Sequence, residues 1–343
     1  PEGVTGIEES AFRECQHLEN IVIPGSVKSI GEGAFLGCTM KNVTISQGVE
    51  SIGQNAFCYA KLENIDISQN VKSIGAYAFR ESTLENIVIP QGVVDIDIGT
   101  FQNSALKNVT IPESVTTIEE QAFEECKFEE VTIPGSVENI GNEAFAYCRN
   151  LKNVVFSEGI ENIGDLAFLY CKKIKRLSIP SSVKTIGDGA FESCIALKSL
   201  TLSEGLESIG GGAFCGCTGL KELTIPGSTK MVGAWAFSTC TGLKNLTISE
   251  GVESIEGMAF IRCKKLESVN IPKSVKRIDM YAFSECANLK NITISEGTKR
   301  IGKAAFAQCG NLTGITIPKS VKKIGNAAFD DCSSQLTIYG KKG

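Results

Sequence analysis

Apolar residues recur along the whole chain in a pattern of 22 or 23 residues, written about fifteen times. The pattern reads L-x-x-I-x-I-P-x-x-V-x-x-I-G-x-x-A-F-x-x-C-x-x. In the copy LENIVI (residues 18–23), the leucine and both isoleucines are inward positions, whereas Asn20 and Val22 are outward positions. This alternation is typical of a β-strand. We therefore predict one short strand per copy, with its apolar side facing a core.

The second half of each copy is too short and too rich in glycine for an α-helix. In the same copy, Val27 and Ile30 are inward positions. Gly31 then allows the backbone more conformations before the small residue Ala34 and the large residue Phe35. We expect a second short strand or bridge at V-x-x-I, and a turn or a 3₁₀ segment around A-F-x-x-C.

A single copy of about 23 residues cannot bury its own apolar face, but stacked copies can bury each other's. The equivalent Leu, Ile, Val and Phe positions would then form continuous ladders, which explains the repetition without a chemical role. We therefore predict one solenoid domain over residues 1–343, of about fifteen coils of 22 or 23 residues. Because residue 1 is a proline already inside a repeat, we expect truncation at both ends.

The strand pattern L-x-x-I-x-I resembles that of leucine-rich repeats, and the continuation IPxSVxxIGxxAFxxC is similar to the BspA-type subclass. The resemblance covers essentially the whole chain. It implies a right-handed, mostly β leucine-rich repeat solenoid, with a parallel concave sheet and with short strands, turns and 3₁₀ segments on the other faces. It also implies a surface protein of anaerobic bacteria or protozoan parasites, with adhesion to host matrix proteins or other cells. The ending LTIYGKKG (residues 336–343) is similar to the start of the family's C-terminal cap.

Composition supports an ordered chain without a membrane segment. Apolar residues make up 42% and charged residues 21% of the sequence, and no run of about eighteen apolar residues occurs. Charge is segregated along the chain: residues 1–261 hold 19 Lys and Arg against 33 Asp and Glu, and residues 262–343 hold 15 against 6. The overall excess of acid argues against nucleic acid as a partner.

The chain has fourteen cysteines, and twelve of them occupy one position, three residues after the repeated phenylalanine. Ala60, Ser82 and Ser104 occupy the same position in other copies, so we predict a ladder of small, buried, reduced thiols rather than disulfides between coils. A metal site around Cys215 and Cys217 is a weaker alternative.

The residues give no support for catalysis or for a bound cofactor. His17 is the only histidine, which excludes a histidine-based triad repeated along the chain or a site of several histidines. The glycine cluster in residues 210–219 lacks the G-K-[ST] continuation of a phosphate loop. We predict no catalytic residue, no metal site and no cofactor.

Two departures from the repeat are candidate partner-binding sites. The position two residues before the phenylalanine holds Trp235, Met258 and Tyr281 in consecutive copies. These three side chains either cover the core and one another, or form a contact patch for a protein or a glycan.

The second departure is basic and lies in the two outward positions of V-x-x-I, where earlier copies mostly have Glu, Ser, Thr or Asn. The last three copies place six cations there: Lys276, Arg277, Lys299, Arg300, Lys322 and Lys323. They are solvated surface cations, or they pair with the acidic surface of a neighbouring molecule or domain, or they form a site for an acidic glycan or protein.

These observations favour a non-catalytic binding or adhesion module that is secreted or lies at the cell surface, with a protein or acidic glycan partner. The alternative is a structural spacer that projects another domain and has no ligand. Uniform Asn and Thr positions on the strand face argue against a finely shaped pocket there. A spacer predicts featureless surfaces, whereas an adhesin predicts local departures such as the aromatic and basic positions.

Overall fold

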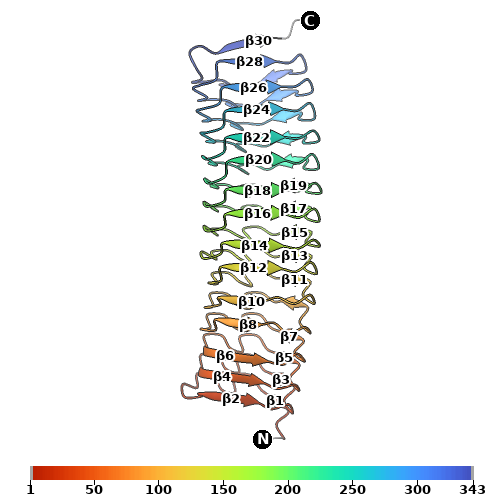
Figure 1. Cartoon of the computed structure of the whole chain (residues 1–343), viewed down its shortest axis with the longest axis vertical. Helices are drawn as coiled ribbons and strands as arrows, with labels where there is room; N and C mark the ends of the chain where they lie inside the picture. Colours follow the sequence, from red (N-terminus) through yellow and green to blue (C-terminus); the bar gives the residue numbers. More distant parts are fainter. Residues whose placement is uncertain (1–2, 341–343) are drawn as a thin grey trace. The chain divides into compact units, whose positions relative to one another are not determined.

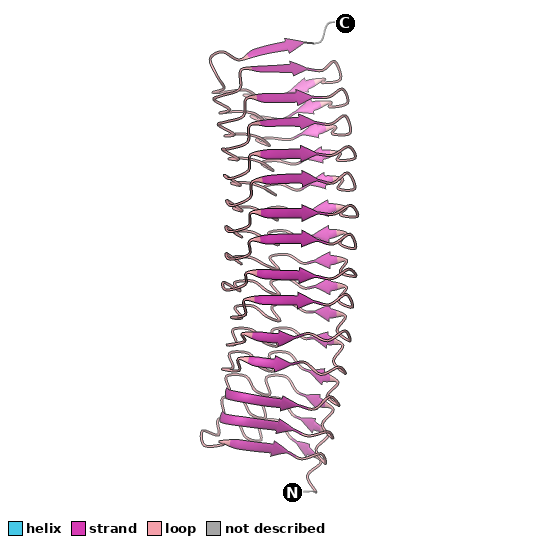
Figure 2. Cartoon of the chain, in the orientation of Figure 1, coloured by secondary structure: helices cyan, strands magenta, loops and turns pink. Residues whose placement is uncertain are grey.

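The computed structural model describes residues 3–340, which form strands connected by turns and loops without a helix (Figure 2). Each repeat contributes a main strand, with an even number, and a two-residue strand, with an odd number (Figure 1). The contacts divide the chain into two compact units, Pro1–Cys171 and Lys172–Gly343. Each unit is a parallel β-solenoid, as the period predicts.

Unit 1 contains the main strands β2 Asn20–Ile23, β4 Thr39–Ile45, β6 Lys61–Ile67, β8 Asn86–Val88, β10 Asn108–Thr110, β12 Glu130–Ile133 and β14 Asn153–Phe156. Its two-residue strands are β1 Gly6–Ile7, β3 Ser29–Ile30, β5 Ser51–Ile52, β7 Ser73–Ile74, β9 Asp95–Ile96, β11 Thr117–Ile118, β13 Asn139–Ile140 and β15 Asn162–Ile163.

Unit 2 contains the main strands β16 Arg176–Ile179, β18 Ser199–Leu202, β20 Glu222–Ile225, β22 Asn245–Ile248, β24 Ser268–Ile271, β26 Asn291–Ile294, β28 Gly314–Ile317 and β30 Thr337–Gly340. Its two-residue strands are β17 Thr185–Ile186, β19 Ser208–Ile209, β21 Met231–Val232, β23 Ser254–Ile255, β25 Arg277–Ile278, β27 Arg300–Ile301 and β29 Lys323–Ile324. The expected cap segment is described as far as β30, which pairs with β28, and residues 341–343 lie outside the described residues.

The core consists of the predicted ladders. Ile23, Val27 and Ile30 are at most 1% exposed, whereas the outward Val22 is 68% exposed. The phenylalanines stack in successive coils, with ring centroids 5.2 Å apart and planes 7° apart for Phe191 and Phe214. The period-two and V-x-x-I assignments of inward residues are therefore confirmed.

The segment around A-F-x-x-C forms turns, and the described residues contain no 3₁₀ helix. The residues two before and two after each phenylalanine adopt a positive φ, as at Gly33 (56°) and Gly37 (67°). Alternate N–H groups therefore bond in different directions: Phe35 donates to Ala56 of the next coil, and Leu36 donates within its own coil to Gly33. This alternation interrupts the run of i to i+3 bonds that a 3₁₀ helix needs.

The main strands do not form one continuous ladder within a unit. In unit 1 the hydrogen-bonded sets are β2-β4-β6, β8-β10 and β12-β14, and in unit 2 they are β16-β18 and β20 to β30. Within each unit, every break comes before a strand that a proline follows: Pro90 after β8, Pro134 after β12 and Pro226 after β20. Proline alone is not sufficient for a break, because β10, β24 and β28 are also followed by proline and stay paired with the preceding main strand. Where serine occupies that position, its N–H bonds the strand end of the preceding coil, as Ser249 does to Ile225 at 3.1 Å. Proline has no N–H for this bond.

A reciprocal set of three hydrogen bonds joins the coils across these proline positions, and we call it the Glu–Ser clasp. The Glu204 carboxylate accepts the N–H groups of Gly227 (3.3 Å) and Ser228 (3.1 Å), and the Ser228 hydroxyl accepts the N–H of Gly205 (3.1 Å). The same bonds recur at Glu296, Ser320 and Gly297. A glycine is required at 205 because its φ is 114° and an added Cβ would lie 2.2 Å from the Ser181 carbonyl oxygen.

Candidate binding surfaces

The two-residue strands of unit 2 place the predicted cations in register. Arg277 pairs with Arg300 across β25 and β27, and Arg300 pairs with Lys323 across β27 and β29. Neighbouring strands in a sheet are about 4.8 Å apart, so each column brings like charges within one Debye length of each other. The structure thus aligns the six residues into two adjacent columns, which we call the cation ladder.

Charge neutralisation within the cation ladder is incomplete. The Arg277 guanidinium contacts the carboxylates of Glu256 and Asp279. The Lys276 and Lys322 ammonium groups each donate to a backbone carbonyl oxygen 3.3 Å away. In the described chain, no ion pair engages the other three cations, and all are exposed: Lys299, Arg300 and Lys323. The ladder therefore presents positive charge to solvent, in a column where like-charged neighbours repel each other.

Trp235, Met258 and Tyr281 lie in consecutive coils, and each has a φ between 56° and 62°. Trp235 is 47% exposed, while Met258 and Tyr281 are half-buried. Lys303 lies 5.9 Å above the centre of the Tyr281 ring. This partial exposure supports both readings, since the side chains cover part of the turn face and still offer surface to a partner.

Two further methionines enlarge this apolar region, and the sequence interpretation missed them. Met231 is 42% and Met280 is 46% exposed. The Met280 side chain lies over Gly257 of the preceding coil, where an added Cβ would come within 3.3 Å of it. Three of the four methionines and the single tryptophan therefore fall within residues 231–280, a clustering that the composition alone could have revealed.

All fourteen cysteines are free thiols. The ladder thiols donate to phenylalanine carbonyl oxygens, as Cys240 does to Phe214 at 3.3 Å. Burial raises the pKa of the Cys126 thiol to about 12, so this thiol stays protonated and unreactive. Cys215 is only half-buried. The described residues hold no group of three or more His, Cys, Asp or Glu side chains that could bind a metal ion, and this includes the surroundings of Cys215 and Cys217.

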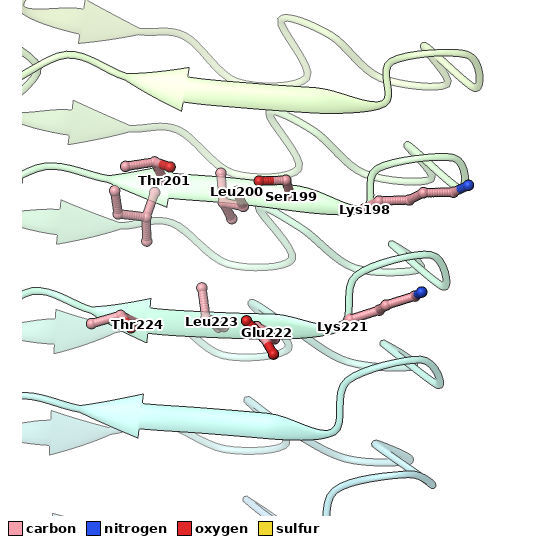
Figure 3. A pocket seen from close by; sticks show the side chains of 9 residues that line it. Lys198, Ser199, Leu200, Thr201, Lys221, Glu222, Leu223 and Thr224 are labelled. Carbon is pink, nitrogen blue, oxygen red and sulfur yellow. The ribbon is translucent and has the colours of Figure 1, made fainter.

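A second basic feature lies at the start of the main strands of unit 2 and was not predicted from the sequence. The residue after the repeated leucine or isoleucine is lysine in four consecutive coils, at Lys175, Lys198, Lys221 and Lys244. Lys244 pairs with Glu267 at 3.4 Å. Lys198 and Lys221 border a groove of about 420 Å³ between β18 and β20 (Figure 3). The sequence shows these lysines at one repeat position. Earlier in the chain, however, the same position holds both lysine and glutamate, so the lysines did not stand out.

The grooves also modify the expectation that the strand face is featureless. Shallow grooves lie at the sheet breaks, between β6 and β8, between β10 and β12, and between β18 and β20. They form because the ladder is interrupted there, although the outward residues are as uniform as the repeat predicts.

Comparison with known families identifies the chain. The model of the BspA type leucine rich repeat region, in six copies, matches residues 5–129, 116–241 and 207–336. The chain belongs to the BspA-type leucine-rich repeat family. No curated protein matches it significantly.

Solved structures agree with this membership of the BspA-type family. A leucine-rich repeat protein from Bacteroides ovatus is 29% identical, with a TM-score of 0.85, over 99% of this chain and 88% of that one. A leucine-rich repeat protein from Eubacterium ventriosum is 27% identical, with a TM-score of 0.53, over 94% of this chain and 84% of that one. In the part of the chain that the structure describes, no helix is long and apolar enough to cross a membrane.

Proposed function

We propose that this BspA-type chain is a non-catalytic binding module that acts at the cell surface or after secretion. Its contacts with an acidic partner are made by the cation ladder, and the neighbouring aromatic and methionine residues add apolar contact. The observation that carries the proposal is the in-register column of Arg277, Arg300 and Lys323. The same position holds Ser208 and Ser254 in other coils of unit 2, so the fold does not require cations there.

The energetics support a role outside folding. Aligned like charges lower the free energy of unfolding slightly. Lys299, Arg300 and Lys323 form no ion pair with a described residue that would offset this repulsion. An acidic partner would offset this repulsion, and the attraction would weaken as salt rises. Trp235 and Tyr281 would contribute contact area of the kind that dominates protein interfaces.

A binding screen of the purified chain tests the proposal. Immobilised matrix proteins and glycans are probed with the intact chain and with K299S/R300S/K323S, which removes the three ladder cations that form neither an ion pair nor a side-chain hydrogen bond with a described residue. The matched control is K28S/K61S/K72S, which makes the same change in charge at exposed positions of unit 1. We expect the first variant alone to bind more weakly than the intact chain. Absence of binding across the screen would favour the spacer, and equal binding by both variants would exclude the cation ladder.

A further inference from the structure

The groove between β18 and β20 is built by the repeat itself. Pro226 lacks the N–H that would bond the end of β18, and the two strands are not hydrogen-bonded to each other. Beyond their carboxyl ends the coils are held together by the clasp of Glu204 with Gly227 and Ser228. The two coils are therefore separated along β18 and β20 and are joined by the clasp beyond the carboxyl ends of these strands.

The lining of this groove mixes apolar surface with hydroxyl groups that can bond sugar hydroxyls. Ser199, Thr201 and Thr224 contribute hydroxyls, which both donate and accept hydrogen bonds. Glu222 adds a carboxylate, one oxygen of which accepts from the Asn245 amide at 3.1 Å. Leu223 is only 3% exposed, so it offers little apolar surface to anchor a peptide side chain.

Two lysines border the groove at the start of its strands. The Lys198 and Lys221 side chains extend side by side in the same direction (Figure 3). Both are exposed, and neither forms an ion pair with another described residue. Lys175 occupies the same position one coil earlier, and its carbonyl oxygen accepts the Lys198 N–H at 2.9 Å. A row of ammonium groups therefore continues along the edge of the strands beyond the groove.

The equivalent grooves of unit 1 lack this feature. Acidic and amide residues line the groove between β6 and β8, including Glu63, Asn64 and Asp66, and no described cation does. At the groove between β10 and β12, Lys107 pairs with Glu85 and Lys152 pairs with Glu129. The same backbone opening thus occurs three times. Lys127 also lines the groove between β10 and β12, where its ammonium group donates to the Glu125 carbonyl oxygen at 2.9 Å. Among the described residues, two strand-start lysines without an ion pair border only the opening between β18 and β20.

We propose that the groove between β18 and β20 binds an acidic sugar unit of a linear anionic glycan. The sugar hydroxyls would bond Ser199, Thr201 and Thr224, and Lys198 and Lys221 would contact its carboxylate or sulfate group. Further anionic groups of the same glycan chain would meet Lys175. This site lies on the main strands, apart from the cation ladder on the two-residue strands, and it deepens the proposed function by naming a ligand class.

The test uses the full chain carrying K299S/R300S/K323S, so that the cation ladder does not contribute. Fluorescence anisotropy measures binding of a labelled heparin-derived hexasaccharide to this chain, to the chain with K198S/K221S added, and to the chain with K107S/K152S added. The last pair is the matched control, at the same repeat position in a groove whose lysines are already paired. We expect K198S/K221S to weaken binding about tenfold and the control to have little effect. Equal affinities for all three proteins, or no binding by the first, would overturn the proposal.

A second variant separates the sugar from its charge. Thr201→Val keeps the shape of the groove but removes a hydroxyl. It should therefore lower the affinity for the hexasaccharide and leave any affinity for poly-glutamate unchanged. If poly-glutamate binds as tightly as the hexasaccharide and is lost equally on K198S/K221S, the site is for acidic polypeptides and the glycan assignment is wrong. Loss of binding only on K299S/R300S/K323S in the original screen would leave the proposed function standing without this second site.

Discussion

Replacing Phe191 by alanine tests the ladder that forms the core of unit 2. Phe191 is fully buried, and its ring stacks on that of Phe214 with centroids 5.2 Å apart. The Phe191 N–H also donates to the carbonyl oxygen of Ala213 in the next coil at 2.7 Å. This hydrogen bond fixes the position of the Phe191 backbone. The surroundings therefore have little freedom to collapse into the space left by the ring.

The cost should lie in the upper part of the range for such substitutions. Large-to-small changes of a buried phenylalanine cost about 3 to 5 kcal/mol, and a lost aromatic pair adds about 0.5 to 1.5 kcal/mol beyond area burial. We expect Phe191→Ala to reduce the free energy of unfolding by about 4 kcal/mol or more.

Urea denaturation followed by fluorescence measures this loss, because the single tryptophan, Trp235, lies in the same unit. The matched control is Phe329→Ala, since Phe329 occupies the same repeat position in the last coil of unit 2 but is only half-buried. Its substitution should cost clearly less. A midpoint for Phe191→Ala that equals the wild type, or a loss no greater than that of Phe329→Ala, would refute the account of the core.

Three further predictions follow from the coil geometry. Alkylation of the native protein followed by mass measurement should leave buried thiols such as Cys240 unmodified until denaturant is added, and a majority of disulfides would contradict this. Hydrogen bonds from Ser228 and Gly227 lower the pKa of Glu204 below 4.5. The stability that Glu204 contributes is therefore present above pH 4.5 and is lost as the pH falls through the folded pKa. Glu204→Gln should flatten the pH dependence of the free energy of unfolding in this acidic range, and an unchanged pH dependence would count against the clasp. Gln308 has a φ of 58°, so Gln308→Val should cost about 1 to 3 kcal/mol while Gln308→Gly is nearly neutral in thermal unfolding, and equal effects would argue against the left-handed conformation.

Sequence alone determined the solenoid because its information is periodic. The inward positions at Ile23, Val27 and Ile30 could be assigned since a strand has only two faces and one of them was consistently apolar. The choice between a turn and a 3₁₀ segment could not be made in advance. It depends on φ values that residues as different as Trp235 and Ala304 adopt in the same way, at 62° and 51°.

The candidate surfaces were predicted unevenly for a related reason. Arg300 and Lys323 were conspicuous because most earlier coils have an uncharged residue at their position. Lys198 and Lys221 were not, because their column holds both signs of charge and only the ion pairs distinguish one coil from the next. The grooves could not be found from side-chain patterns at all, since they result from missing backbone hydrogen bonds.

The order of proline and serine shows that the later part of the chain repeats in pairs of coils. Pro134, Pro180, Pro226, Pro272 and Pro318 are 46 residues apart, and serine takes the position in each coil between them. Each coil with serine at this position has the sequence S-E-G, whose glutamate accepts the clasp bonds. Each coil with proline has a serine, and in the clasp its N–H donates to that glutamate and its hydroxyl accepts from the glycine, as Glu204, Ser228 and Gly205 show. Loss of a ladder bond is thus offset by a side-chain bond to the same neighbouring coil. The main sheet can therefore be interrupted at a proline coil, as between β18 and β20, while the core stacking is kept. Proline permits this interruption but does not force it, because β24 and β28 stay paired with the preceding main strands although Pro272 and Pro318 follow them.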